Sequence, residues 1–174
     1  MKIQGENSIA LVSWGQDHFH KLYPLANNIR ISQNLKDSFP HPYTLHDARA
    51  WIEHNIKFTP SQNFAIEMDG KLVGAIGGVI GKEELRTNME IGFWLGEAYW
   101  GQGIATEALK LFVPYIFQRF PIHRVYAQVY ENNLASMRVL EKSGFVEEAI
   151  LKFGYIKNDQ IGDLFQYVRL RDND

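Results

Sequence analysis

The chain has 174 residues, of which 45% are hydrophobic and 22% are charged, and its formal net charge is -2. This composition suits one globular domain spanning residues 1–174; without a block of Lys and Arg or an apolar run of ~20 residues, we expect neither a nucleic-acid partner nor a membrane partner. The absence of cysteine excludes disulfides, cysteine-ligated zinc and a cysteine nucleophile, and is typical of a cytoplasmic protein.

The first part of the chain combines a short apolar run with helical patterns. The pattern predicts a strand over 9–12, a helix over 16–27 and an irregular segment over 28–43 that contains two prolines. Thr44 and Asp47 have the spacing of a capping box, which predicts that a helix begins directly after Thr44.

A hairpin is predicted next. Strands 64–68 and 72–80 flank an Asp-Gly dipeptide, which is a strong signal for a two-residue turn. A further strand over 90–95 contains Gly92, and an interior glycine indicates either a bulge or the close approach of another group.

The longest predicted helix extends from about Gly101 to Arg119, with apolar residues along one face. Gly144 is expected to end a later, shorter helix in a left-handed conformation. The elements after the longest helix are a strand, that short helix and two strands: 124–130, 133–142, 145–152 and 163–170. This order indicates a mixed α/β domain of the α+β type.

The turn before the longest helix reads Trp-Gly-Gln-Gly-Ile-Ala. Gly101 and Gly103 allow the backbone to approach a ligand, and the first N–H groups of a helix suit a phosphate. No Lys-Ser or Lys-Thr follows, which excludes a P-loop, and Thr106 replaces the third glycine of a dinucleotide fingerprint. On this turn alone, a connection that binds no ligand is an equal alternative.

Two spaced motifs together resemble the GNAT superfamily of N-acetyltransferases. Gly103 and Ala105 occupy the last two fixed positions of its pyrophosphate motif, Q/R-x-x-G-x-G/A, whereas Trp100 replaces the first residue. That tryptophan is common in the ribosomal-protein N-terminal acetyltransferase-like (Rim-type) branch. The segment from Asn133 to Phe145, N-L-A-S-M-R-V-L-E-K-S-G-F, is similar to the signature of the same branch.

The resemblance implies the GNAT fold, a mixed and mostly antiparallel sheet of about seven strands with flanking helices, splayed between strands 4 and 5. It also implies acetyl-CoA as the acetyl donor. The pyrophosphate would bind main-chain N–H groups of the turn, namely Gln102, Gly103, Ile104, Ala105 and Thr106. The thioester arm would bind the main chain of a bulged fourth strand at Phe93, Trp94 and Leu95, whose rings can also pack in the core.

The resemblance assigns three further side chains, each with a plainer alternative. Asn133 would hold the pantetheine arm, or it caps a helix, a role that Asn132 could otherwise take. Ser136 would give a proton to the leaving thiolate, or it is simply a small helical residue. Glu90 is the candidate general base, or it is an ordinary surface carboxylate. A late-chain glutamate of some ribosomal-protein acetyltransferases is replaced here by Tyr155.

The sequence therefore favours an acetyl-CoA-dependent N-acetyltransferase that acts on a primary amine. The acceptor would be a protein N-terminus, by resemblance that of a ribosomal protein, or a small amine. The alternative is a non-catalytic acyl-CoA sensor or interaction domain. We expect loops 28–43, 81–89 and 153–162 to line the acceptor site and no metal to be bound, because the histidines lack ligand spacing. A homodimer is compatible with the resemblance.

Overall fold

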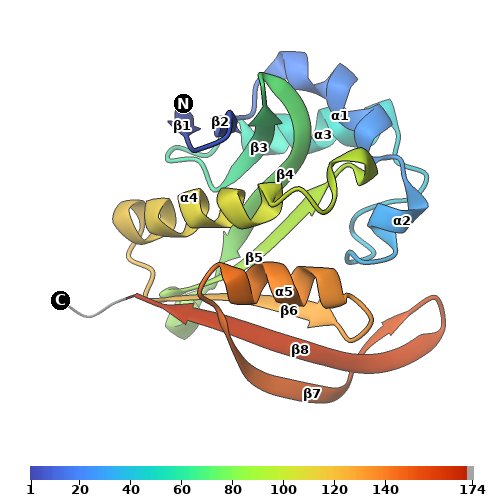
Figure 1. Ribbon diagram of the computed structural model, residues 1–174, viewed down its shortest axis with the longest axis vertical. Coiled ribbons are helices and arrows are strands. Elements are labelled where there is room, and N and C mark those ends of the chain that lie inside the picture. The colour runs from blue at the N-terminus through green and yellow to red at the C-terminus, as the bar shows by residue number, and fades with distance from the viewer. Residues whose placement is uncertain (172–174) are drawn as a thin grey trace.

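An eight-stranded sheet forms the centre of the computed structural model, which describes residues 1–171 (Figure 1). The spatial order is β1-β2-β3-β4-β5-β6-β8-β7, and β5 and β6 form the one parallel pair in this sheet. The strands are β1 Lys2–Gln4, β2 Ile9–Ser13, β3 Asn63–Met68, β4 Lys71–Ile80, β5 Asn88–Leu95, β6 Arg124–Tyr130, β7 Val146–Lys157 and β8 Gln160–Leu170. The eighth strand, beyond the expected seven, is β1, which pairs with β2.

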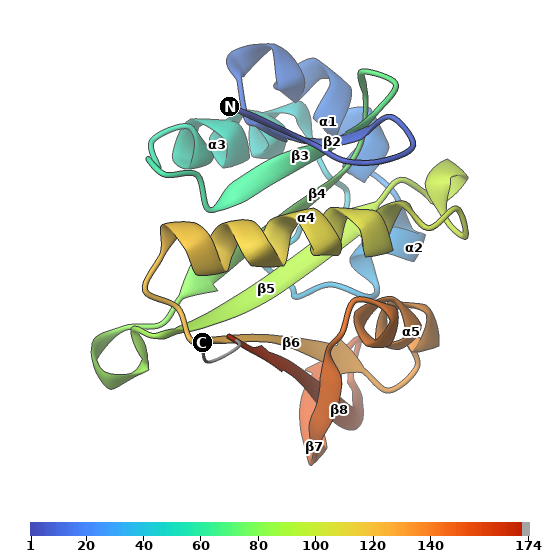
Figure 2. The same ribbon diagram turned by 60° about the vertical axis from the view of Figure 1, so that its left-hand side comes forward.

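Helices cover both faces of this sheet. The longest helix, α4, lies on the face opposite α1 and α3 (Figure 2). The α-helices are α1 Phe19–Ala26, α2 Ile29–Ser32, α3 Leu45–Asn55, α4 Ile104–Arg119 and α5 Leu134–Lys142, and the 3-10 helices are η1 Gln16–His18, η2 Glu83–Leu85 and η3 Glu97–Tyr99. Within residues 1–171, no helix has the length and apolar content needed to cross a membrane.

Two apolar clusters hold these layers together. Phe64 and Ile66 of β3 belong to the larger cluster, which includes Phe112 of α4. Ala65, between them on the same strand, belongs to the smaller cluster with Ile52 of α3. Successive side chains of a strand point to opposite faces, so β3 contributes to both clusters.

Several local predictions are confirmed. Thr44 and Asp47 form a capping box at the start of α3: the Thr44 hydroxyl accepts from the Asp47 N–H at 3.2 Å, and the Thr44 N–H donates to the Asp47 carboxylate at 2.8 Å. Asp69 forms the turn between β3 and β4 with the glycine that follows it. Gly144 follows α5 with φ +81°.

Two parts of the chain differ in detail from the prediction. The segment 28–43 contains the short helix α2, which is capped by the Asn28 side chain accepting from the Arg30 N–H at 2.8 Å. Helix α4 begins at Ile104 rather than at Gly101, because the left-handed φ of +78° at Gly103 does not belong to a right-handed helix.

The expected loop 153–162 is instead the tip of the β7–β8 hairpin. Asn158 and Asp159 have φ of +49° and +61°, as a two-residue hairpin turn requires, and the strands pair up to this turn. Between Leu151 and Tyr155 the register shifts, and Phe153 has φ +53°. This irregularity interrupts the alternation on which the strand prediction depends.

The sheet opens between β5 and β6, as expected. Their register contains three pairs, from Asn88 opposite Arg124 to Glu90 opposite Tyr126, and ends there. The bulge that the resemblance implied in β5 is wrong, because β4 and β5 pair without a register shift. The shift lies between β3 and β4, at residues 66 and 67.

Candidate active site

Two cavities meet where β5 and β6 separate. The first, of about 370 Å³, is lined by residues 99–106 and by α5, and we call it the turn cavity. The second, of about 820 Å³, has walls rich in aromatic side chains, and we call it the aromatic cavity. Four residues line both cavities and form their boundary: Asn34, Leu35, Phe93 and Trp94.

The turn before α4 presents a row of free main-chain donors to the turn cavity. The first bond of the helix runs from the Glu107 N–H to the Gly103 carbonyl at 3.1 Å, and Gly103, as the N-cap residue, has no side chain that could cap the helix. Within residues 1–171, the N–H groups of residues 101–106 have no hydrogen-bond acceptor. Because they lie at the positive end of the α4 dipole, this turn is suited to an anion such as a phosphate.

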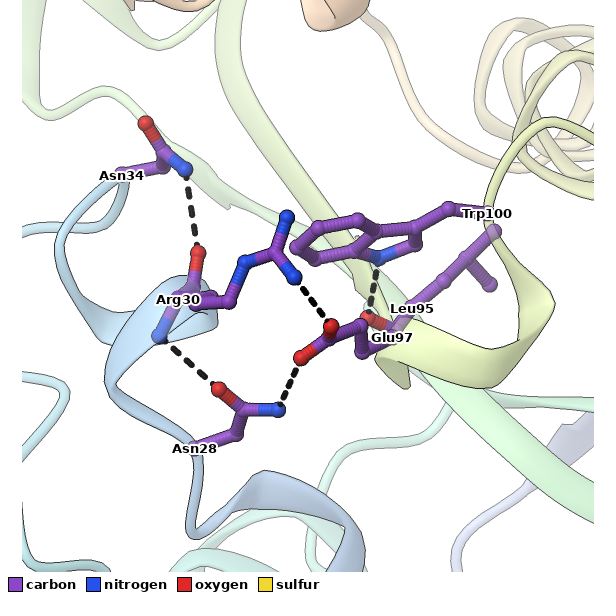
Figure 3. Close-up of polar contacts among 6 residues, drawn as sticks. All are labelled: Asn28, Arg30, Asn34, Leu95, Glu97 and Trp100. Carbon is purple, nitrogen blue, oxygen red and sulfur yellow. Dashed lines mark hydrogen bonds and ion pairs between the residues drawn. The ribbon is translucent and has the colours of Figure 1, made fainter.

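Trp100 anchors this turn (Figure 3). Its indole N–H donates to the Leu95 carbonyl at 2.9 Å, which joins the turn to the end of β5. The Arg30 guanidinium of α2 lies 5.3 Å from the centre of the Trp100 ring and forms an ion pair with Glu97. Asn28 donates to the same carboxylate at 2.8 Å. A tryptophan at this motif position therefore holds the turn between β5 and α2.

The Gln102 side chain belongs to the turn itself. Its amide donates to the Ala98 carbonyl at 2.9 Å, so its main-chain N–H is the group left for an anion.

The open edge of β5 presents a second set of main-chain groups. The Gly96 N–H donates to the Val73 carbonyl of β4. Main-chain groups alternate in direction along an antiparallel strand, so those of Trp94 also point to β4. Those of Phe93 and Leu95 point the other way, into the gap between β5 and β6. The Leu95 carbonyl is taken by Trp100. Phe93 and Leu95 therefore offer main-chain groups to an extended ligand, and Trp94 contributes its ring at the cavity boundary.

Asn133 and Ser136 both line the turn cavity. The Asn133 side-chain oxygen Oδ1 accepts from the Ser136 N–H at 3.2 Å, so Asn133 itself caps α5, and the role expected for Asn132 is wrong. In the part of the chain that the structure describes, the side-chain nitrogen Nδ2 of Asn133 and the Ser136 hydroxyl have no hydrogen-bond partner. Both groups can therefore serve a ligand.

Glu90 lies in the other cavity. It occupies the paired end of β5, lines the aromatic cavity and forms an ion pair with Lys36 at 2.5 Å. Burial, and then the charge of Glu90, raises the pKa of the neighbouring Tyr126. The structure therefore places Glu90 and Ser136 in different cavities that meet at Phe93 and Trp94.

The sequence reasoning missed three basic side chains of the turn cavity, Arg30, Arg138 and Lys142. Arg138 and Lys142 are four residues apart on α5, and this spacing could have placed them on one face. Nothing near Arg30 in the sequence predicts its contact with Trp100. Among residues 1–171, no group of three or more His, Cys, Asp or Glu side chains is arranged to hold a metal ion.

Comparison with known proteins shows which family this chain resembles. Residues 9–146 match the model of the acetyltransferase (GNAT) domain. The ribosomal-protein-serine acetyltransferase of Escherichia coli is 28% identical over 177 residues, covering 98% of this chain and 97% of that protein. The probable N-acetyltransferase YjcK of Bacillus subtilis is 45% identical over 76 residues, which span 44% of this chain and 40% of that protein. Among solved structures, the ribosomal alpha-N-protein acetyltransferase RimL in complex with coenzyme A has a TM-score of 0.87 at 22% identity and covers 100% of both chains.

Proposed function

This chain belongs to the acetyltransferase (GNAT) domain family, and we propose that it transfers the acetyl group of acetyl-CoA to a primary amine by direct attack on the thioester. As a member of this family, the protein is an N-acetyltransferase. We propose here its donor, its acceptor and the residues that act in the reaction. One observation carries it: the free N–H groups of residues 101–106 line a cavity that meets a second cavity at Phe93.

The turn cavity suits the donor along its whole length. The N–H groups from Gln102 to Thr106 would bind the pyrophosphate, with Arg138 and Lys142 supplying positive charge nearby. The pantetheine arm would extend along the open edge of β5, with the Asn133 amide as a further donor. Acetyl-CoA bound in this way would have its thioester at the boundary of the two cavities.

We assign the chemical roles of individual groups from the same geometry. The main-chain N–H of Phe93 is our candidate donor to the thioester oxygen, which gains charge as the amine attacks. Ser136 would protonate the thiolate that leaves; since a thiol has a pKa of ~8.5, we expect its contribution to be modest. Glu90 would accept the amine proton from the aromatic cavity, through water.

A protein N-terminus is the acceptor that we favour. The aromatic cavity, at about 820 Å³, has room for more than one residue of a peptide. An α-amine has a pKa of about 8, against ~10.4 for lysine, so a larger share is neutral and nucleophilic near pH 7. The similarity to an enzyme named for ribosomal-protein serine supports this choice, and a small amine is the alternative acceptor.

An acceptor screen with thiol detection tests the proposal. Acetyl-CoA is incubated with the protein and with peptides or small amines, and the CoA thiol is quantified. We expect thiol release that depends on the acceptor. Binding of acetyl-CoA without thiol release across the panel would instead support the non-catalytic sensor.

A further inference from the structure

Four glycines lie in the neighbouring strands β4 and β5, and three of them are required by packing. A Cβ at Gly74 would lie 2.2 Å from the Trp94 carbonyl oxygen. At Gly77 it would lie 1.7 Å from the Asn63 amide oxygen, and at Gly78 it would lie 2.7 Å from the Glu90 carbonyl oxygen. No larger residue fits at these three positions without a shift of its neighbours.

Gly92 is different, because a Cβ at this position would have no heavy atom of residues 1–171 within 4 Å apart from those of its two chain neighbours. Its φ lies outside the left-handed region that favours glycine. A glycine inside a strand costs about 0.5–1 kcal/mol relative to alanine, and β-branched residues are preferred there. Neither the packing nor the backbone of this protein therefore explains a glycine at residue 92.

The free space at Gly92 belongs to the aromatic cavity. Gly92 lies between Glu90 and Trp94 on the face of β5 that lines this cavity. Gly92 pairs with Gly77, which in turn pairs with Asn63, so these residues form one row across the sheet. We call this row the glycine trough; it leads from the Asn63 amide to the gap beside β6.

The trough has a polar end. The Asn63 side chain lies over Gly77 and lines the aromatic cavity. Across residues 1–171 its side-chain amide has no hydrogen-bond partner, so it can bind a polar group of a molecule lying in the trough.

We propose that Gly92 determines the specificity of the acceptor site, because the first residue of an acceptor peptide lies over it. The inference rests on the proposed function and refines it. The Asn63 amide binds a main-chain group of the peptide, and the absent side chain at Gly92 leaves room for the peptide's first side chain. A larger residue at 92 would fill that room without disturbing the turn cavity on the other side of Phe93.

The test compares Gly92→Ala and Gly92→Val with the unchanged protein, using peptides that differ only in an N-terminal Gly, Ser or Leu. We expect Gly92→Val to keep the acetyl-CoA Kd and to unfold at the same or a higher temperature. Its kcat/KM for the Leu peptide should fall by about tenfold or more relative to the Gly peptide, since one methylene in a filled pocket has an effect of about 10–200-fold. Gly92→Ala should be intermediate.

Gly78→Val is the matched control, because its Cβ would meet main chain and its melting temperature should fall. A comparable fall in Gly92→Val would show that the fold requires the glycine and would overturn the inference. An unchanged first-residue preference in Gly92→Val would also overturn it, while leaving the proposed function intact. If the unchanged protein acetylates none of the peptides, the proposed acceptor fails and this inference fails with it.

Discussion

At the scale of single residues, Trp100 connects distant parts of the chain. Its indole bonds to Leu95 five residues earlier, and its ring lies beside Arg30, seventy residues away. The motif around Trp100 predicted a binding turn, because a turn is a local feature. The Arg30 contact could not be predicted, because only the fold brings α2 to this turn.

Replacing Trp100 tests this anchor. Trp100→Phe keeps a ring beside Arg30 but leaves the Leu95 carbonyl without its donor, which costs about 1 kcal/mol or more. We expect the acetyl-CoA Kd to rise several-fold in a calorimetric titration. Tyr99→Phe is the control: it changes the neighbouring residue of the same cavity but removes only a hydroxyl that forms no hydrogen bond within residues 1–171, so it should bind nearly as the unchanged protein does. Equal Kd values for both variants would show that the Trp100–Leu95 hydrogen bond is not needed to hold the turn.

Asn133 has two separable roles. Asn133→Ala should lose about 1 kcal/mol of stability with the cap of α5 and should also raise the KM for acetyl-CoA. Asn133→Ser retains a capping oxygen but has no amide N–H, so it should recover the stability and not the KM. Thermal unfolding and initial rates measure the two effects. Full recovery of the KM by serine would show that Asn133 is a cap alone.

Glu148 gives the stability a defined pH dependence. Hydrogen bonds from Arg124, and then from Gln166, lower the pKa of Glu148 from 4.5 to about 2. Since the pKa is lower in the folded state, the stabilisation is complete above pH 4.5 and is lost as the pH falls from there towards 2.

Glu148→Gln should therefore reduce the loss of thermal stability across this pH window. The variant lies outside both cavities, so its acetyl transfer near neutral pH should be unchanged. If the melting temperatures of the variant and of the unchanged protein fall equally as the pH is lowered, Glu148 is not the group responsible for this pH dependence.

At the scale of elements, the segment after α2 bridges the opening of the sheet. Leu35 lines both cavities, and its carbonyl accepts from the Lys157 ammonium of β7 at 2.9 Å. Lys157 also forms an ion pair with Asp37 at 2.6 Å, and Lys36 pairs with Glu90 on β5. We call residues 34–37 the bridging segment; its position depends on contacts across the sheet.

Removing the Lys157 charge should loosen the bridging segment. We expect Lys157→Met to raise the KM for the acceptor several-fold, because the side chain is only 13% exposed and holds two groups of the segment. Steady-state kinetics with Lys152→Met provides the comparison, since Lys152 is on the same strand but pairs with Asp163. Similar kinetics in both variants would show that the segment is held by other contacts.

Some elements could be predicted from sequence patterns and others could not. Apolar periodicity predicted the strands and long helices because each has a regular buried face. It did not predict α2, which is only four residues long, or the outer part of the β7–β8 hairpin, where the register shifts near Phe153. Regular elements were therefore predictable, whereas short or irregular ones depended on tertiary contacts.

At the scale of the whole molecule, the short parallel pairing of β5 and β6 creates the site. Three paired positions hold the strands together, and beyond them the sheet opens between the two cavities. Two motifs in the sequence were enough to indicate this fold and a donor. The placement of Glu90 and Ser136 in separate cavities could not be predicted, since it depends on which residues form the boundary inside the opening, and Asn34 and Leu35 reach it only through the fold.

The most direct test uses a peptide with a free α-amine and one lysine, incubated with acetyl-CoA and the protein and then analysed by mass spectrometry. We predict one added acetyl group, on the α-amine, with an equal amount of CoA thiol released. Gly103→Pro should abolish both, because proline cannot adopt the φ of +78° at this residue. The account would be contradicted if the protein binds acetyl-CoA but acetylates neither this peptide nor any small amine.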